Sequence, residues 1–322
     1  MMKRKEGRAM LIDLGSAASF LKENDNFTIL THAHPDGDTL GSGIGLCLAL
    51  RALGKKANVI NNEEIPPKFR YLEIEPQEFE EQTVVAVDIA DVMLMGNDIK
   101  EKYEAKVDLS LDHHGSNRLF AKLNCVNSSA AAAAQIIFEL VELLGVQITP
   151  QIADCLYTGI STDTGCFRYA NVTPETHRVA AKLMEYGADA AKINVKMFET
   201  KTRTYAALER LALDGMQFFY DGRCALITIT REMFAESGSD ENECDGIAAI
   251  SRQIEGVLVG VTMRERRDGT YKASVRTHNP VDASAICARL GGGGHPNAAG
   301  CQLPGTREEA TKLLIDTIGE FI

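Results

Sequence analysis

The stretch Thr31–Gly43 reads T-H-A-H-P-D-G-D-T-L-G-S-G, and the interpretation of the whole chain starts from it. The apolar, β-branched run before it, residues 27–31, predicts a buried strand. The apolar run after it, residues 43–54, ends in glycine and predicts a helix. In open α/β sheets, the turn between a strand and the following helix is where ligands bind. The side chains of this turn that can bind a ligand are His32, Asp36 and Asp38.

Pro35 and Gly37 bend this turn, so that the carboxylates of Asp36 and Asp38 can point at one place. Two like charges held so close repel each other strongly unless a cation lies between them. The alternative is a polar loop in which an aspartate only caps the helix. Because His32 lies in the same turn, we expect a metal site here.

Apolar runs typical of strands alternate with segments typical of helices along the first part of the chain. This alternation predicts an α/β domain with a doubly wound, mainly parallel sheet. The acidic segment 62–82 contains two prolines and is expected to be mostly loop. The expected strands cover residues 27–31, 57–61, 84–88 and 107–114, and the expected helices cover residues 11–23, 43–54, 130–145, 150–163 and 174–187.

The chain has 322 residues, which is enough for two domains. A polar, lysine-rich segment around residues 189–205 indicates the connection between them. Beyond it, apolar runs on both sides of Asp268-Gly269 predict two strands joined by a turn. We therefore expect a smaller mixed α/β domain at the C-terminal end. The expected divisions are a metal-binding catalytic domain at 1–190, a linker at 191–214 and a substrate-binding domain at 215–322.

Further candidate ligands stand at the ends of other expected elements. Asp88 ends one strand, and Asp112, His113 and His114 end the next, while Asp163 lies in T-G-I-S-T-D-T-G. The carboxyl ends of parallel strands lie on one edge of the sheet, so these groups can converge. Each has an ordinary alternative: a turn or cap for Asp88, a strand-end pair for the histidines and a solvated helix face for Asp163.

Carboxylates with imidazoles, and without thiolates, suit a hard-to-borderline ion such as Mn²⁺. Two such ions about 4 Å apart can hydrolyse a phosphodiester, because they supply a nucleophile and shield the phosphate charge. The spacing allows His32 and Asp36 to share one ion, with Asp38 on the other. The groups left to bridge the ions and complete the set are Asp88, His113 and Asp163.

The C-terminal part contains the glycine-rich run G-G-G-G-H-P-N-A-A-G at residues 291–300. Glycines let a backbone come close to a phosphate, and the N-terminus of a helix expected to follow would favour an anion. The alternative is a plain loop before a helix. Residues 251–300 hold seven Lys or Arg against four Asp or Glu, which favours a phosphate-facing surface. The candidate substrate-binding residues are Gly292, Gly293, Gly294, His295 and Arg276.

Four motifs of the first domain together resemble those of the DHH phosphoesterase superfamily: H-A-H-P-D-G-D, V-V-A-V-D, L-D-H-H-G-S-N and T-G-I-S-T-D-T-G. The glycine-rich run resembles the first subtype of DHH-associated domain. The resemblance covers nearly the whole chain and implies a phosphoesterase with two Mn²⁺ ions per active site. It implies that Asp88 bridges the ions, that His114 faces the scissile phosphate and that Asp112 orients the histidines. The implied ligands are His32, Asp36 and Asp88 for one ion, and Asp38, Asp88, His113 and Asp163 for the other.

Within the superfamily, the two-domain chain most resembles the nanoRNase type. That resemblance implies short single-stranded RNA or DNA oligonucleotides, or 3′-phosphoadenosine 5′-phosphate, as substrates. The alternatives are a RecJ-like exonuclease, a family-II pyrophosphatase and a phosphodiesterase for cyclic or linear di-adenosine phosphates. From another class, a non-catalytic nucleotide sensor would have lost a metal ligand, and none is missing from the motifs.

The net charge of −11 argues against tight wrapping of long nucleic acid, which relies on many Lys or Arg contacts to phosphates. No apolar run approaches the ~18 residues of a membrane span, so no membrane partner is expected. The eight cysteines form no CxxC pair, and we interpret them as reduced thiols of a cytoplasmic protein. The oligomeric state stays open, and a homodimer is the assembly to be tested.

Overall fold

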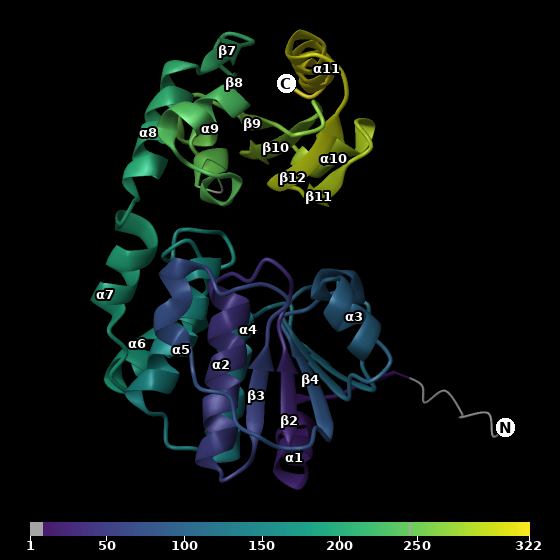
Figure 1. The fold of residues 1–322 in the computed structure, drawn as a ribbon, viewed down its shortest axis with the longest axis vertical. Helices are drawn as coiled ribbons and strands as arrows, with labels where there is room; N and C mark the ends of the chain where they lie inside the picture. Colours follow the sequence, from purple (N-terminus) through teal and green to yellow (C-terminus); the bar gives the residue numbers. More distant parts are fainter. Residues whose placement is uncertain (1–8, 245) are drawn as a thin grey trace, which may run out of the picture. The chain divides into compact units, whose positions relative to one another are not determined.

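The computed structural model describes residues 9–244 and 246–322. The chain divides into two compact units after Thr200, each with its own sheet and its own apolar core (Figure 1). Within the described residues, no helix is both long enough and apolar enough to cross a bilayer.

The first unit contains a parallel sheet of six described strands in the order β1-β6-β5-β4-β2-β3. Strands β2, β4 and β5 are buried along their whole length, which explains why β2 and β4 consist mostly of apolar residues. The two strands that follow β2 in the chain, β3 and β4, lie on opposite sides of β2 in the sheet. A ligand crevice is therefore expected beside β2. The strands are β1 (Met10–Leu11), β2 (Phe27–Leu30), β3 (Ala57–Ile60), β4 (Thr83–Val87), β5 (Leu109–Asp112) and β6 (Leu123–Val126).

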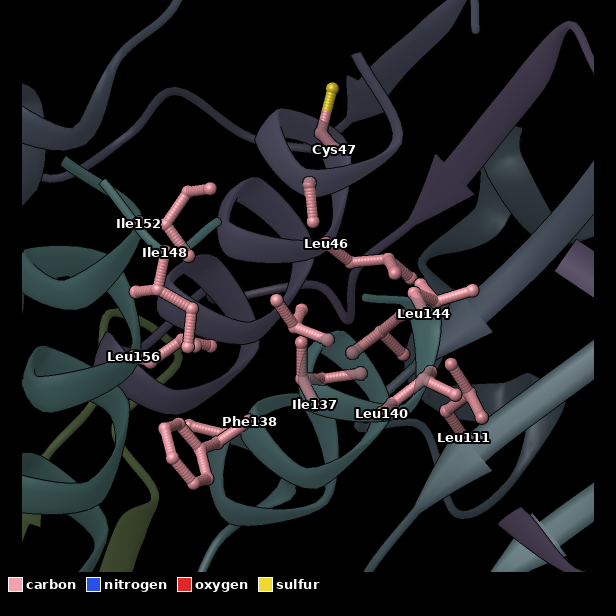
Figure 2. Packing of buried hydrophobic residues seen from close by; sticks show 14 of the residues in the cluster. Leu46, Cys47, Leu111, Ile137, Phe138, Leu140, Leu144, Ile148, Ile152 and Leu156 are labelled. Atoms are coloured by element: carbon pink, nitrogen blue, oxygen red, sulfur yellow. The ribbon is translucent and has the colours of Figure 1, made fainter. Parts of the chain in front are cut away.

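Helices cover both faces of this sheet. Side chains of α1, α2, α4 and α5 pack with alternate residues of the strands, and Figure 2 shows Leu46, Ile137, Leu140 and Leu111 gathered in that core. The other face packs against α3, and Figure 1 shows α3 and α2 on opposite sides of the sheet. The helices are α1 (Leu14–Glu23), α2 (Gly37–Ala52), α3 (Asn97–Tyr103), α4 (Ala133–Leu144), α5 (Pro150–Asp163), α6 (Pro174–Glu185) and α7 (Ala190–Asn194), with short helical turns η1 (Pro67–Leu72), η2 (Val92–Met95) and η3 (Val195–Glu199).

Glycines let α2 and α5 approach each other closely. A Cβ atom at Gly41 would clash with the carbonyl oxygen of Cys155, and one at Gly159 would lie 2.8 Å from Oδ1 of Asp38. Gly37, at the start of α2, faces Thr162, near the end of α5. The packing therefore brings the first turn of α2 next to the last turn of α5.

The second unit contains a mixed sheet of six described strands in the order β11-β12-β10-β9-β8-β7. Only β8 and β9 run parallel within it; the other described neighbours are antiparallel. One face packs against α10 and α11, and the other against α8 and α9. The elements are α8 (Arg203–Asp214), β7 (Gln217–Phe219), β8 (Cys224–Ile229), α9 (Arg231–Ser237), β9 (Val259–Glu265), β10 (Tyr271–Thr277), α10 (Ala283–Arg289), β11 (Gly293–His295), β12 (Ala298–Leu303) and α11 (Arg307–Gly319), with short turns η4 (Glu241–Glu243), η5 (Ile247–Ala249) and η6 (Ser251–Gln253).

The structure corrects one local expectation and adds detail to two others. Helix α2 begins at Gly37 and not near residue 43, because the Asp36 side chain accepts the N–H groups of Asp38 and Thr39 and caps the first turn. Part of the expected loop 62–82 is the helical turn η1. The expected linker 191–214 is mostly helical, since it contains α8, η3 and most of α7.

The glycine-rich run does not precede a helix. Gly293–His295 is the short edge strand β11, which pairs with β12, and the next described helix begins only at Arg307. The expected helix N-terminus is therefore wrong for this run, and any anion contact there must come from the strand backbone and side chains.

Candidate metal centre

The carboxyl edge of the first sheet gathers all the expected metal ligands of the chain. His32 follows β2, Asp88 follows β4, and His113 follows β5. The close packing of α2 and α5 adds side chains from the start of α2 and from the end of α5 to this edge. Asp36 caps α2, Asp38 lies in its first turn, and Asp163 is the last residue of α5.

The first cluster is formed by His32, Asp36 and Asp88. Nε2 of His32 lies 3.7 Å from Oδ1 of Asp36 and 3.7 Å from Oδ2 of Asp88. Nδ1 of the same ring lies 2.8 Å from the carbonyl oxygen of Ala33, so Nδ1 carries the proton and donates it. The lone pair of Nε2 therefore faces the two carboxylates, as a metal ligand requires.

The second cluster surrounds His113. Its Nε2 lies 3.5 Å from Oδ1 of Asp88, 3.8 Å from Oδ2 of Asp38 and 3.7 Å from Oδ2 of Asp163. Nδ1 of His113 lies 3.3 Å from the carbonyl oxygen of Ala130, which again leaves Nε2 to face the carboxylates. Separations of 3.5–3.8 Å are too long for hydrogen bonds and suit neighbouring ligands of one ion.

Asp88 belongs to both clusters, because its two oxygens face different histidines. The side chain is only 3% exposed, and Oδ1 has no hydrogen-bond partner among the described residues. Its backbone is in the left-handed region, with φ +59°, a conformation that costs free energy and is found at functional sites. Burial, then the nearby carboxylate of Asp38, raises the pKa of Asp88 well above its usual value.

These observations test whether a metal pair fits the residues present. A buried carboxylate oxygen without a donor is costly, and several carboxylates crowded together repel one another. A divalent cation on each side of Asp88 would remove both costs, and the oxygen and imidazole donors suit a hard-to-borderline ion. Repulsion without a cation is also visible at Asp163, where burial, then Asp38 and Asp36, raises the pKa to about 8. The residues present therefore fit a pair of divalent metal ions.

Asp38, a member of the second cluster, is held in place by several hydrogen bonds. It is buried, and its oxygens accept the N–H groups of Ala133 at 2.6 Å and Ala134 at 2.9 Å, together with the hydroxyl of Ser42 at 3.0 Å. These N–H groups belong to the first turn of α4, where unpaired donors and the helix dipole favour an anion. Asp38 thus stabilises the start of α4 and also belongs to the second cluster, whereas the expected capping of α2 comes from Asp36.

His114 differs from the other two histidines, because its Nδ1 donates to Oδ1 of Asp112 at 2.8 Å. Asp112 is fully buried, and its Oδ2 accepts from Nδ2 of Asn117 at 2.6 Å. Nδ1 of His114 also lies 3.6 Å from Oδ1 of Asp88, but a protonated nitrogen cannot bind a metal. The structure therefore favours His114 as a neighbour of the metal site and not as a ligand.

Asn117 was missed as a contributor to this site. It stands five residues after Asp112 in L-D-H-H-G-S-N, so the motif contained it, but only the folded chain shows that its amide faces the buried carboxylate. Ser42 was missed for the same reason.

The candidate substrate residues of the second unit form a row on its sheet. Arg276 of β10 pairs with Ala298 of β12, which pairs with His295 of β11. Directly paired residues of antiparallel strands point to the same face, so Arg276 and His295 share one face, about 10 Å apart in strand spacing. Within the described residues, a Cβ atom at Gly293 would meet nothing within 4 Å, so its backbone is open to a ligand.

The neighbouring glycines also contribute to packing. A Cβ atom at Gly294 would lie 2.6 Å from the carbonyl oxygen of Ala298, and one at Gly292 would lie 2.6 Å from Cβ of Cys301. Both are therefore needed for close packing on β12. Arg264 and Arg267 lie beside Glu241 and do not extend the row of Arg276.

Comparison with known proteins gives a consistent assignment. A family model described as "DHH family, N-terminal domain" matches residues 26–160, and one described as "DHHA1 domain" matches residues 225–322. The chain is 36% identical over 301 residues to the "Bifunctional oligoribonuclease and PAP phosphatase NrnA" of Thermus thermophilus, across 91% of this chain and 89% of that protein. The chain belongs to the DHH family.

Other members and folds agree with this. The protein of the same name from Bacillus subtilis is 26% identical over 303 residues, across 90% of this DHH-family chain and 93% of that protein. An exopolyphosphatase-related protein from Bacteroides fragilis has the same fold, with a TM-score of 0.88, 24% identity and 95% coverage of both chains. RecJ from Thermus thermophilus, solved with Mn²⁺, has a TM-score of 0.56 at 17% identity, across 95% of this chain and 54% of that one.

Proposed function

We propose that this DHH-family chain is a Mn²⁺-dependent phosphoesterase with two metal ions in its active site. Its substrates are oligonucleotides of about two to five nucleotides, which it hydrolyses to mononucleotides, and 3′-phosphoadenosine 5′-phosphate, which it hydrolyses to AMP. The names of the relatives from Thermus thermophilus and Bacillus subtilis support these substrate classes. The observation that carries the proposal is the position of Asp88, whose two oxygens face two separate groups of ligands.

In this proposal, His32, Asp36 and Asp88 hold one ion, and Asp38, Asp88, His113 and Asp163 hold the other. When bound, the two ions provide Lewis-acid contacts to the phosphate and a nucleophile at neutral pH. The Mn²⁺ in the RecJ structure of the same fold supports the choice of metal for this donor set.

The residues of the chain itself contribute binding and orientation. The hydrogen bond from Nδ1 to Asp112 raises the pKa of His114 and favours its cationic form. Nε2 of a cationic His114 can then donate a charge-assisted hydrogen bond to a phosphate oxygen. In the second unit, Arg276, His295 and the open backbone of Gly293 provide donors for another phosphate or terminal group of the substrate.

The charge of the chain limits the length of the substrate. Each added nucleotide brings another negative charge to a chain whose net charge is −11. The Debye length at cellular salt is only about 8 Å, so repulsion acts mostly over the first added units.

We also infer a cytoplasmic location, which fits the absence of disulfides among the described residues.

The test is a substrate panel assayed with metal-free protein to which Mn²⁺ is added back. It comprises a dinucleotide, a five-mer, 3′-phosphoadenosine 5′-phosphate, cyclic di-adenylate, pyrophosphate and a ladder of single-stranded RNAs up to about 24 nucleotides. We expect Mn²⁺-dependent release of mononucleotides, with kcat/KM highest for the shortest RNAs. Equal or rising kcat/KM with length would contradict the short-substrate assignment and favour a RecJ-like exonuclease. Pyrophosphate as the best substrate would favour a pyrophosphatase.

Two neighbouring histidines provide matched variants for this panel. His32 faces the carboxylates, whereas His34 in the same turn is 86% exposed and contacts only Glu63 among its described partners. His32→Asn should abolish activity, and His34→Asn should retain it, since asparagine tolerates the left-handed backbone at position 34. Equal activity of the two variants would contradict the proposed site.

A further inference from the structure

We propose that Asn171 is a positioning residue for Asp38, His113 and Asp163, the three ligands that share one metal position with the bridging Asp88. The side-chain amide of Asn171 joins the two backbone segments that place these three ligands. The inference rests on the proposed two-metal function. It predicts that Asn171 strengthens metal binding at one of the two metal positions and not at the other.

One of these segments is Ala130–Ala134, called the alanine segment below. Its residues are buried, and its backbone contacts two of the three ligands. The carbonyl oxygen of Ala130 accepts from His113, and the N–H groups of Ala133 and Ala134 donate to Asp38. A shift of this segment would therefore move both ligands together.

The amide of Asn171 connects this segment to the third ligand. Nδ2 of Asn171 donates to the carbonyl oxygen of Ala131 at 2.9 Å and to that of Asp163 at 3.2 Å. Only an NH₂ group can donate to two carbonyl oxygens, so the orientation of the amide is determined. Asp163 ends α5, where the last carbonyl groups have no partner inside the helix. Asn171 thus fixes the end of α5 relative to the alanine segment.

The chain follows an unusual path to bring Asn171 to this place. Gly165, Cys166 and Phe167 all have left-handed backbones, with φ of +56°, +58° and +60°. Residues with side chains rarely adopt this region. The left-handed turn folds the chain back after α5, so that Asn171 reaches the carbonyl group of a residue eight positions earlier.

The other metal position is held by different contacts. His32 is oriented by Ala33, and Asp36 by the N–H groups of Asp38 and Thr39, all within one turn of the chain. None of the described hydrogen bonds of His32 or Asp36 involves Asn171 or the alanine segment. Loss of the Asn171 amide should therefore weaken one metal position and spare the other.

The test is Mn²⁺ binding to metal-free wild type, Asn171→Ala and Asn171→Asp, measured by calorimetry and by electron paramagnetic resonance. Contacts that orient metal ligands typically change affinity by about 10–100-fold, and we expect the lower end of this range for one of two sites. The other site should keep its affinity within about twofold. At a Mn²⁺ concentration that fills both wild-type sites, the variants should give the spectrum of an isolated ion, and excess Mn²⁺ should restore the coupled pair.

Controls separate this effect from a general loss of stability. Asn24 donates its amide to the carbonyl oxygen of Phe20 at 2.8 Å, just before β2 and away from its carboxyl end, so Asn24→Ala should bind two ions as wild type does. In an Asp163→Ala background, where this metal position is already lost, Asn171→Ala should not weaken the remaining site further.

Three results would overturn the inference: unchanged affinities in both Asn171 variants, equal weakening of both sites, or the same loss in Asn24→Ala. A wild type that binds no pair of ions would instead overturn the proposed two-metal function.

Discussion

Nδ1 of His114 donates a hydrogen bond to Oδ1 of Asp112, and the two atoms are 2.8 Å apart. Asp112 is fully buried, whereas the His114 side chain is 33% exposed. Burial acts to raise the pKa of Asp112, but the hydrogen bonds from His114 and Asn117 outweigh it, and the net pKa is lowered. Asp112 therefore stays ionised, fixes the proton on Nδ1 of His114 and leaves Nε2 for another partner.

Replacing Asp112 by asparagine should uncouple this pair. The carboxylate accepts from the N–H of His113, Nδ1 of His114 and Nδ2 of Asn117, whereas an amide has only one accepting oxygen. At least one of these three donors would then face the NH₂ group of the asparagine, which is itself a donor. We expect Asp112→Asn to lower kcat by about 10²-fold while the protein still binds two Mn²⁺ ions. Asn117→Ala should give a smaller loss in the same steady-state assay, and an unchanged kcat in Asp112→Asn would contradict the orienting function.

Asp88→Asn tests the shared ligand. Its amide offers one oxygen for metal binding, so it cannot bridge two ions, and kcat should fall by about 10²-fold or more. The metal-free variant should lose less stability than wild type as pH rises, because its amide has no proton to lose and no buried charge to form. Thermal unfolding in a chelator and turnover in saturating Mn²⁺ measure the two effects. Near-wild-type turnover in the metal-replete variant would rule out a bridging Asp88.

Much of the first unit could be predicted from the sequence, because its signals are local. Strands β2, β4 and β5 are buried on both faces, and β2 and β4 accordingly consist mostly of apolar residues. Helix α6 begins at Pro174 behind the cap of Thr173, and this start was predicted from proline at the first helical position. The convergence of ligands followed from their places at the ends of parallel strands.

What was missed depends on how the folded chain pairs its strands and orients its side chains. The short strand β1 exists only because it pairs with β6, more than 100 residues away. Gly293–His295 lacks β-forming residues and is a strand only because β12 lies beside it. The first turn of α2 was assigned to the loop, since only the folded chain shows that Asp36 caps it. Hydrogen bonds such as that of Asn117 are also decided by the tertiary structure.

His295→Ala should weaken substrate binding without affecting the metals. His295 lies in the second unit on β11, and the metal-ligand clusters found among the described residues lie in the first. Loss of one charge-assisted hydrogen bond should raise KM by about tenfold or more. Metal analysis should show unchanged Mn²⁺ content. A variant that loses Mn²⁺ and keeps its KM would contradict the assignment of His295 to the substrate.

The metal-free protein should lose stability as pH rises from about 4 to 8. Folded Asp163 keeps its proton up to a pKa of about 8, whereas an unfolded aspartate loses it near pH 4. Between these values the native state binds more protons than the unfolded state, so the free energy of unfolding falls, by at most about 1.4 kcal/mol per pH unit for one group.

Other groups of the site, such as Asp88 and His32, have raised pKa values and act in the same direction. The contribution of Asp163 is therefore the difference between wild type and Asp163→Asn. Denaturant unfolding in a chelator at several pH values should show a shallower fall for the variant. Parallel curves would mean that the Asp163 carboxyl does not hold its proton in the folded, metal-free protein.

The central claim, that Asp88 bridges two metal ions, is tested most directly by anomalous diffraction at the manganese edge from crystals grown with Mn²⁺. We predict two peaks about 3.5–4 Å apart on either side of Asp88. One should lie beside His32 and Asp36, and the other beside His113 and Asp163. A single peak, or a pair of peaks that does not share Asp88, would contradict the account.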